Sequence, residues 1–339
     1  MKLGSMDQDL SGGYTRPLIL RAALDVEGMT GLLAPLLEPL VRSAGKISVE
    51  YAELLTYKRG RRGIIRYDVK AGDQAVVVLG KVYADLHRAV DVHATMDLLW
   101  TTVFNRSEVF GVPRPLGYLR DPAMLVYVPV EGRHLHEFTL RGGALDRFAQ
   151  AGRWLATLHR SRMPLPRSLD LMAECAQMKA WAGLLGYCYP DLAPQADRLS
   201  EVLGDTATTL QIKTEVPIHK DFHYEHVVAG DGLWAIDFDE MRLGEPNCDL
   251  AHFRAYLDLL ALRVGVPVTV LQAAFVGAYA EPAVWTPGRC FDWFYAFTCL
   301  KIIKQLCTMR GLHPRPVGVE QRRQVEAMLA RAWRSIGVG

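Results

Sequence analysis

The hydrophobic and polar positions change their period about a third of the way along the chain. Residues 61–69 (RRGIIRYDV) and 74–83 (QAVVVLGKVY) are rich in β-branched residues. The turn KAGD joins them, so they predict a β-hairpin. Residues 85–104 contain no glycine or proline and predict a helix. Two more strands are expected at PLGYL (115–119) and MLVYVPV (124–130), around a turn that contains proline.

After residue 132 the pattern becomes helical. Within residues 143–160 the apolar side chains recur at i, i+3 and i+4, which predicts an amphipathic helix. Three short strands are expected at VPI (216–218), HVVA (226–229) and LWAIDF (233–238). The other predicted helices lie at about 170–188, 195–211, 249–263, 268–280, 290–309 and 319–337.

These elements predict an α+β protein with two lobes. A chain of 339 residues is too long for one compact core. We expect an N-terminal extension at 1–50 with a short helix near 28–42, a β-rich lobe at 51–128 and a mainly helical lobe at 129–339. The smaller lobe would be an antiparallel sheet.

Charge is balanced along the chain. Residues 1–127 carry 16 Lys and Arg against 14 Asp and Glu, and residues 128–339 carry 23 of each. Proteins that bind nucleic acid show a basic face, so this balance argues against such a partner. The most apolar later stretch, residues 256–280, contains two charged residues and a proline. It is too interrupted to span a membrane.

The six cysteines have no C-x-x-C spacing, and a chain of this size needs no disulfides for stability. The first residues, MKLGSMDQDLSGG, have no apolar core and do not predict a signal peptide. We therefore expect reduced thiols in a cytoplasmic protein.

The segment with the most candidate chemistry is HKDFHYEH, residues 219–226. It resembles the H-R-D-L-x-x-x-N catalytic loop of protein kinases, except that His226 stands where that pattern has Asn. Asp237 follows Asp221 by sixteen residues, in an Ile-Asp-Phe-Asp run where the D-F-G aspartate would fall. GEPNCDLAHF (244–253) is similar to the Gly-x-Pro-x-x-Asp-Leu-Ala segment of one family of small-molecule kinases.

Together these motifs identify the chain as resembling the aminoglycoside-phosphotransferase-like family, which has a protein-kinase-like fold. The resemblance extends over roughly 55–330 and is strongest at 217–253. It implies transfer of the γ-phosphoryl group of ATP or GTP, with Mg²⁺, to a hydroxyl of a small molecule, either an antibiotic or a metabolite. An antibiotic acceptor would make it a resistance enzyme.

The resemblance also implies a role for each aligned residue in phosphoryl transfer. Such transfer depends on positioning and on charge neutralisation. Asp221 would orient the acceptor hydroxyl and take its proton, and Asp237 would hold Mg²⁺, which prefers hard oxygen ligands. Lys81 would reach the phosphates from the hairpin. Asp97, with Glu108 as the alternative, would pair with Lys81.

Two further nucleotide contacts follow from the same alignment. Arg61, in the turn KRGRRG (58–63), would add charge beside the phosphates. The backbone around Val126 and Val128 would hydrogen-bond to adenine.

His226 leaves three interpretations open. It donates a hydrogen bond to phosphate or to Asp221, it binds the metal through a ring nitrogen, or the protein binds nucleotide as a pseudokinase that transfers nothing. Imidazole suits Zn²⁺, Mn²⁺ or Fe better than Mg²⁺. We favour the first interpretation.

A metal-dependent hydrolase is a further alternative, with ligands from the loop histidines and from His134 and His136. No zincin pattern such as H-E-x-x-H supports it.

Several other residues allow a structural reading. His159 is expected to pack in the core, His219 to hold the loop, and Asp249 to cap a helix and brace the loop. Acidic residues after Asp237 would recognise an amine in the acceptor; they are Asp239, Glu240 and Glu245. Four aromatic residues would line an acceptor pocket or belong to the core; they are Trp181, Trp293, Tyr295 and Phe297.

Overall fold

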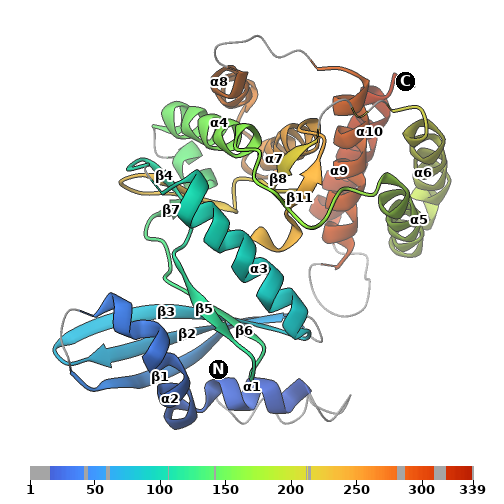
Figure 1. The fold of residues 1–339 in the computed structure, drawn as a ribbon. Helices are drawn as coiled ribbons and strands as arrows, with labels where there is room; N and C mark the ends of the chain where they lie inside the picture. Colours follow the sequence, from blue (N-terminus) through green and yellow to red (C-terminus); the bar gives the residue numbers. More distant parts are fainter. Residues whose placement is uncertain are drawn as a thin grey trace. The chain divides into compact units, whose positions relative to one another are not determined.

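The structure is a computed structural model of the chain, and it forms two compact units, Met1–Glu131 and Gly132–Gly339 (Figure 1). The described residues are 16–41, 45–58, 62–105, 107–140, 143–210, 212, 215–280, 287–308 and 318–337.

The N-terminal unit is built on a five-stranded antiparallel sheet in the order β1-β2-β3-β6-β5. The predicted hairpin is confirmed as β2 and β3, in which Ile64 pairs with Lys81. The strands β5 and β6 and the helix α3 are also where the sequence predicts them. The bounds are β1 (Ile47–Lys58), β2 (Arg62–Ala71), β3 (Gln74–Tyr83), α3 (Leu86–Leu98), β4 (Phe110–Gly111), β5 (Pro115–Leu119) and β6 (Met124–Tyr127).

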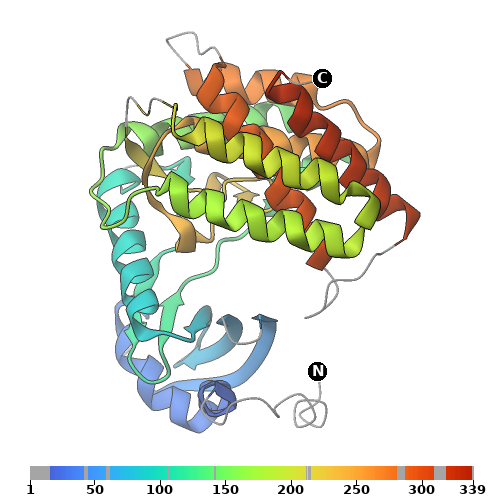
Figure 2. The ribbon, with the colours of Figure 1, turned by 90° about the vertical axis from the view of Figure 1, so that its right-hand side faces the viewer.

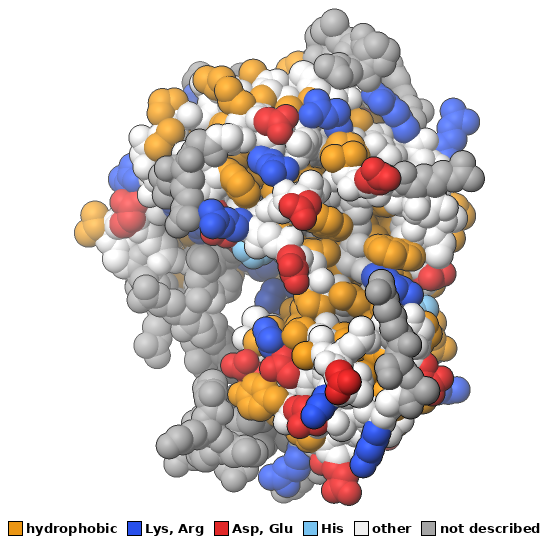
Figure 3. Space-filling view, turned by 90° about the vertical axis from the view of Figure 1, so that its left-hand side faces the viewer, with side chains coloured by type: hydrophobic (Ala, Val, Ile, Leu, Met, Phe, Trp, Pro, Cys, Tyr) orange, Lys and Arg blue, Asp and Glu red, His pale blue; other side chains and the backbone are white. Residues whose placement is uncertain are grey.

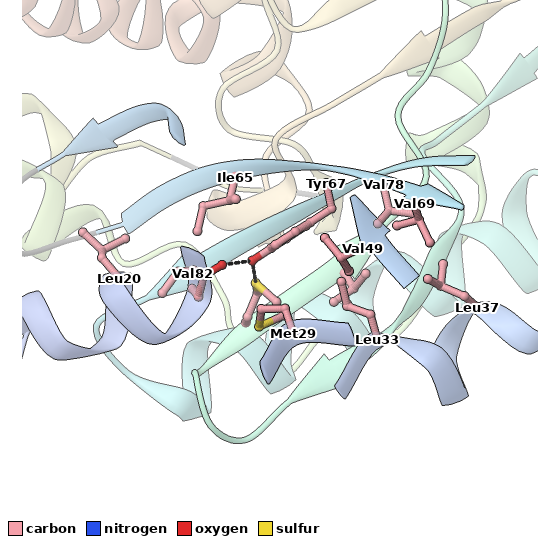
Figure 4. Packing of buried hydrophobic residues seen from close by; sticks show 13 residues of the cluster. Leu20, Met29, Leu33, Leu37, Val49, Ile65, Tyr67, Val69, Val78 and Val82 are labelled. Carbon is pink, nitrogen blue, oxygen red and sulfur yellow. Dashed lines mark hydrogen bonds between the residues drawn. The ribbon is translucent and has the colours of Figure 1, made fainter. Parts of the chain in front are cut away.

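Two helices precede the sheet, α1 (Arg16–Leu24) and α2 (Val26–Leu37), where one short helix near 28–42 was expected. Figure 4 shows how they pack: Leu20 of α1 and Met29 and Leu33 of α2 meet the apolar side chains of the strands. Tyr67 lies fully buried in this cluster and donates its hydroxyl to the carbonyl oxygen of Ala23. This part of the chain is therefore an integral layer of the N-terminal unit.

The C-terminal unit is mainly helical, as predicted, and its helices begin and end within a few residues of their expected bounds. Figure 2 shows α5 and α6 side by side on one flank of it. The helices are α4 (Ala144–Arg160), α5 (Leu171–Cys188), α6 (Ala193–Ala207), α7 (Asn247–Val264), α8 (Thr269–Ala280), α9 (Arg289–Thr308) and α10 (Val319–Ser335).

Short antiparallel strands connect these helices and carry the loop of interest. β9 lies between β7 and β10 in one sheet, and β8 pairs with β11 in another. The bounds are β7 (Arg133–His134), β8 (Val216–Ile218), β9 (Val227–Ala229), β10 (Leu233–Ala235) and β11 (Arg242–Gly244).

No helix among the described residues is long and apolar enough to cross a bilayer. All six cysteines are among the described residues, and none of them forms a disulfide. On the face in Figure 3, acidic and basic side chains are interspersed, in keeping with the balanced charge of the sequence.

Close packing of α4 against α8 depends on Gly152. A Cβ atom at this position would lie 2.2 Å from the carbonyl oxygen of Phe275, a contact that only a backbone shift relieves. At Gly183 of α5 a Cβ would meet no atom within 4 Å.

We therefore predict opposite effects of two Gly→Ala changes on stability. Gly152→Ala should lower the free energy of unfolding by about 1–3 kcal/mol through overpacking. Gly183→Ala should raise it by about 0.5–1 kcal/mol through helix propensity. Urea unfolding followed by tryptophan fluorescence measures both. Equal effects of the two substitutions would contradict the packing argument.

Candidate active site

The loop 219–226 connects β8 to β9, and the strand pairings bring three of the predicted site residues together. Asp221 and His226 lie on the loop itself. Asp237 follows β10, which pairs with β9 directly after the loop. The backbone N–H of Ile236 donates to the carbonyl oxygen of His226 at 2.9 Å, so the two segments are joined next to the site.

One buried carboxylate holds the start of the loop. Asp249, in the first turn of α7, accepts the backbone N–H groups of His219 and Lys220, each at 2.7 Å. This bears out its expected bracing role. The expected capping role is wrong, because α7 begins at Asn247 and its N-cap is Pro246.

His159 completes this network. Its Nε2–H donates to Asp249 at 3.1 Å, and its Nδ1 faces the hydroxyl of Tyr279 at 2.9 Å. Burial alone would raise the pKa of Asp249, but these hydrogen bonds lower it below its ordinary 3.8. His159 is buried as expected, and it also tethers the loop to α4.

His219 joins the loop to the segment that follows β10. It is fully buried, and its Nε2 lies 3.1 Å from the carbonyl oxygen of Ile236. This geometry agrees with the loop-holding role expected from the sequence.

Two residues beside the site have positive φ angles, which non-glycine residues rarely adopt. They are Lys220 at 65° and Asp237 at 66°. Such conformations cluster at functional sites because surrounding contacts maintain them. Lys220 turns its ammonium group toward buried Glu174, which also lies 3.7 Å from Arg242. Lys220, the basic residue of the loop, therefore pairs with Glu174 and not with Asp221.

Asp221 lies close to one ammonium group and two imidazole rings. Its Oδ1 is 2.7 Å from Nζ of Lys301 and 3.3 Å from Nε2 of His252. Its Oδ2 is 3.5 Å from Nδ1 of His226. Burial would raise the pKa of Asp221, but the Lys301 ammonium and His252 hold it well below 3.8. Asp221 is therefore a carboxylate across the physiological pH range.

His226 lies between the two aspartates. Its Nδ1–H donates to the backbone carbonyl of Asp221 at 2.8 Å, and its Nε2 is 3.7 Å from Oδ2 of Asp237. In the neutral ring the Nε2 lone pair thus faces Asp237. Metal-binding histidines usually donate their other N–H in this way. One ligand atom from each of the three residues lies within 4.8 Å of the others, so the set fits a divalent cation.

The other loop histidine is committed elsewhere. His223 is buried and stacks on Tyr256, with ring centroids 4.1 Å apart and an interplanar angle of 6°. Burial holds the pKa of His223 well below 6.5. A second possible cation group joins Asp221 with His223 and His252, but the backbone N–H of Glu225 already donates to Nδ1 of His223.

The predicted nucleotide-binding residues lie in the N-terminal unit. Lys81 is buried on β3 with its ammonium 5.7 Å from the ring centroid of Tyr83. Asp97 is exposed on α3, and its pairing with Lys81 stays a prediction. Glu108 is also exposed. Arg61 lies outside the described residues.

The two valines of the predicted adenine contact lie at the end of β6. Val126 pairs with Gly80 on one side and with Gly117 on the other. The N–H of Val128 donates to the carbonyl of Arg114 at 2.9 Å. Because this bond uses the N–H of Val128, only its carbonyl oxygen remains for the predicted contact with adenine.

Sequence reasoning missed two residues that contact Asp221, namely His252 on α7 and Lys301 on α9. Lys301 and Lys304 interrupt the largely apolar stretch FTCLKIIKQL, and a lysine between Leu300 and Ile302 was the available signal. Three of the aromatic residues considered for an acceptor pocket are buried in the core; they are Trp293, Tyr295 and Phe297.

These features define a protein-kinase-like phosphotransferase architecture. The profile of a family described as the phosphotransferase enzyme family, APH, matches residues 63–285. The chain therefore belongs to this family of small-molecule kinases, as its motifs indicate. No curated protein matches the sequence.

Solved structures share the fold at low identity. The spectinomycin phosphotransferase APH(9)-Ia has a TM-score of 0.62 and 12% identity, covering 91% of this chain and 98% of that one. Choline kinase LicA from Streptococcus pneumoniae has a TM-score of 0.59 and 12% identity, covering 90% and 99%. Amicoumacin kinase hAmiN has a TM-score of 0.59 and 13% identity, covering 85% and 89%.

The lowered pKa of Asp249 predicts a specific loss of stability in acid. A carboxyl group with a depressed folded-state pKa stabilises the fold above its unfolded pKa, near 3.8, and this contribution is lost as pH falls through the folded value. Asp249→Asn should lower stability at pH 7 by about 3–5 kcal/mol, as expected for breaking a buried pair. The variant should also show a weaker pH dependence below pH 4 than the wild type.

Urea unfolding between pH 2.5 and pH 7 measures this difference. Asp231→Asn, an exposed change in the turn between β9 and β10, is the control and should follow the wild type. If Asp249→Asn followed it too, the bracing role would be refuted.

Proposed function

We propose that this chain moves the γ-phosphoryl group of ATP to a hydroxyl group of a small molecule. In this proposal Asp221 accepts the hydroxyl proton, and Asp237 and His226 hold the divalent cation. The observation that carries it is the cluster in which the Asp221 and Asp237 carboxylates flank the His226 ring at 3.5 and 3.7 Å.

The transfer assigns one role to each group. The acceptor oxygen forms a bond to the γ-phosphorus as its O–H bond breaks, and the proton passes to Asp221. The bond between the γ-phosphorus and the bridging oxygen breaks, and its electron pair stays on ADP. A bound cation would neutralise phosphate charge. Since Asp221 stays ionised far below neutral pH, it orients the hydroxyl more than it draws off the proton early.

The donor set bears on the choice of cation. One imidazole nitrogen with carboxylate oxygens suits Mn²⁺ better than an all-oxygen set would, while Mg²⁺ prefers oxygen. The backbone carbonyl of Asp221 already occupies Nδ1 of His226. This is a hydrogen bond to Asp221, as favoured from the sequence, although it is made to the backbone carbonyl. Because it uses Nδ1, it supports metal binding through Nε2 as an additional role of the ring.

Relatives support a nucleoside triphosphate as the donor. The spectinomycin phosphotransferase was solved with ADP, and amicoumacin kinase with AMP-PNP and Ca²⁺. An aminoglycoside 2'-phosphotransferase of 13% identity and TM-score 0.55 was solved with GDP. We propose ATP here, with GTP as the alternative, and Lys81 as the phosphate-binding residue.

The acidic residues after Asp237 give little support to an amine acceptor. Asp239 and Glu245 are buried, Glu245 accepts from Asn247, and Glu240 pairs with Arg242 at 2.9 Å. A polycationic antibiotic would need unpaired carboxylates. The burial and pairing of these carboxylates favour an acceptor without several positive charges.

The second candidate function is a pseudokinase that binds nucleotide without transfer. The histidine at position 226 is the observation that favours it, because an Asn there would offer oxygen to Mg²⁺.

Substitution of the two aspartates should separate binding from transfer. Asp237→Ala should abolish the metal-dependent part of ATP binding, since it removes the cation's carboxylate. Asp221→Ala should leave ATP binding intact and reduce turnover by about 10²–10⁴-fold. Calorimetry with ATP and Mg²⁺ or Mn²⁺, followed by ADP release across an acceptor panel, measures both. Asp231→Asn is the surface control, and full activity in both alanine variants would sink the site assignment.

The cation can be examined without turnover. Pulsed electron paramagnetic resonance of bound Mn²⁺ should show coupling to a ¹⁴N nucleus in the wild-type protein, because Nε2 of His226 is a ligand. His226→Asn should remove the coupling and shift the preference for ATP binding from Mn²⁺ toward Mg²⁺. Absence of nitrogen coupling in the wild type would mean that His226 does not bind the metal.

A further inference from the structure

The ammonium group beside Asp221 comes from a distant helix. Lys301 lies on α9, whose neighbouring residues Leu300, Ile302 and Ile303 are almost completely buried. Placing a lysine there is costly unless its charge is paired. Its side chain is 17% exposed, and its pKa is raised, because the attraction of Asp221 outweighs the lowering effect of burial.

Among the described residues, the hydrogen-bond and ion-pair partners of Lys301 belong to the proposed catalytic loop. Its Nζ lies 2.7 Å from Oδ1 of Asp221 and 3.4 Å from the backbone carbonyl of Lys220. Within the described part of the chain it contacts no other carboxylate at ion-pair distance. Lys301 therefore serves this loop and not a general surface network.

No other described cation of the loop replaces it. Lys220 is paired with Glu174, and His223 stacks on Tyr256. Nε2 of His252 lies 3.3 Å from Oδ1 of Asp221, farther than the ammonium group of Lys301 at 2.7 Å. Among the described basic side chains, Lys301 therefore makes the shortest ion-pair contact with Asp221.

The two oxygens of Asp221 are used differently. Lys301 and His252 both contact Oδ1. Oδ2 lies 3.5 Å from Nδ1 of His226, but the Nδ1–H of that ring already donates to the backbone carbonyl of Asp221. Oδ2 is thus the oxygen left to accept from an incoming hydroxyl, and the side chain of Asp221 is 20% exposed.

We propose that Lys301 is a positioning residue for the transfer, which anchors Oδ1 of Asp221 so that Oδ2 faces the acceptor hydroxyl. This rests on the proposed function. The proton of the acceptor goes to Oδ2, and Lys301 neither gains nor loses one.

The test compares three variants of the full chain. Lys301→Met removes the charge and keeps the length, Lys301→Arg restores a charge, and Lys304→Met is the control. Lys304 lies one turn further on α9, with its ammonium 5.8 Å from the ring centroid of Trp181. Thermal melts show whether each variant folds. Calorimetry gives the Kd for ATP with Mg²⁺ or Mn²⁺, and ADP release with water and with each acceptor of the panel gives kcat and KM for ATP.

Lys301→Met should leave the Kd and KM for ATP unchanged and lower kcat by about 10²-fold, the cost of a misplaced catalytic group. Lys301→Arg should recover much of kcat, and Lys304→Met should match the wild type. If Lys301 were only structural, Lys301→Met would change stability and KM together, and Lys301→Arg would not selectively restore kcat.

Other outcomes overturn the inference. An unchanged or increased kcat in Lys301→Met would mean that the pair is dispensable or inhibitory. A wild type that binds ATP and never releases ADP would leave no transfer to position, and would favour the pseudokinase. A wild type that binds no ATP would refute the proposed function itself, and the binding measurement separates these cases.

Discussion

The site depends on a single buried carboxylate, Asp249. Its two oxygens accept backbone N–H groups from consecutive residues, His219 and Lys220, while His159 donates from α4. A fully buried charge is tolerated only when it is paired and hydrogen-bonded, and this one has three donors. Because the N–H groups belong to the residues just before Asp221, the same contacts that stabilise the buried charge also fix where the loop starts.

Beyond Asp249, the charged residues of the loop form two separate ion pairs. The positive φ of Lys220 directs its ammonium group to Glu174, whereas the next residue, Asp221, turns toward Lys301. A carboxylate that contacts a buried ammonium remains ionised, which suits a group that positions a hydroxyl. His226 then lies between the two aspartates: its Nδ1–H donates to the backbone carbonyl of Asp221, and its Nε2 is 3.7 Å from Oδ2 of Asp237. The positions of the reactive groups thus follow from the buried contacts of Asp249 and Lys220.

Much of the architecture was predictable from sequence. The hairpin of β2 and β3 and the long helices have clear periodicity, and the order of Asp221, Asp237 and the GEPNCDLAHF segment identified the family. β1 was missed although its first residues, ISVEY, alternate between apolar and polar, because it is an edge strand and most of its side chains are exposed. The contact of Lys301 with Asp221 spans 80 residues, and no local pattern reports such a distance. Asp97 was chosen by spacing alone, and its exposure on α3 could not be read from that spacing.

The proposed function requires that a γ-phosphoryl group leaves ATP and becomes an ester of a small hydroxylated molecule at this site. Phosphorus NMR of the purified protein with ATP, Mg²⁺ or Mn²⁺ and a panel of acceptors tests it directly. A new phosphomonoester resonance should grow in step with ADP for at least one acceptor. Nucleotide that binds, yet stays intact across the panel with either metal, would contradict it.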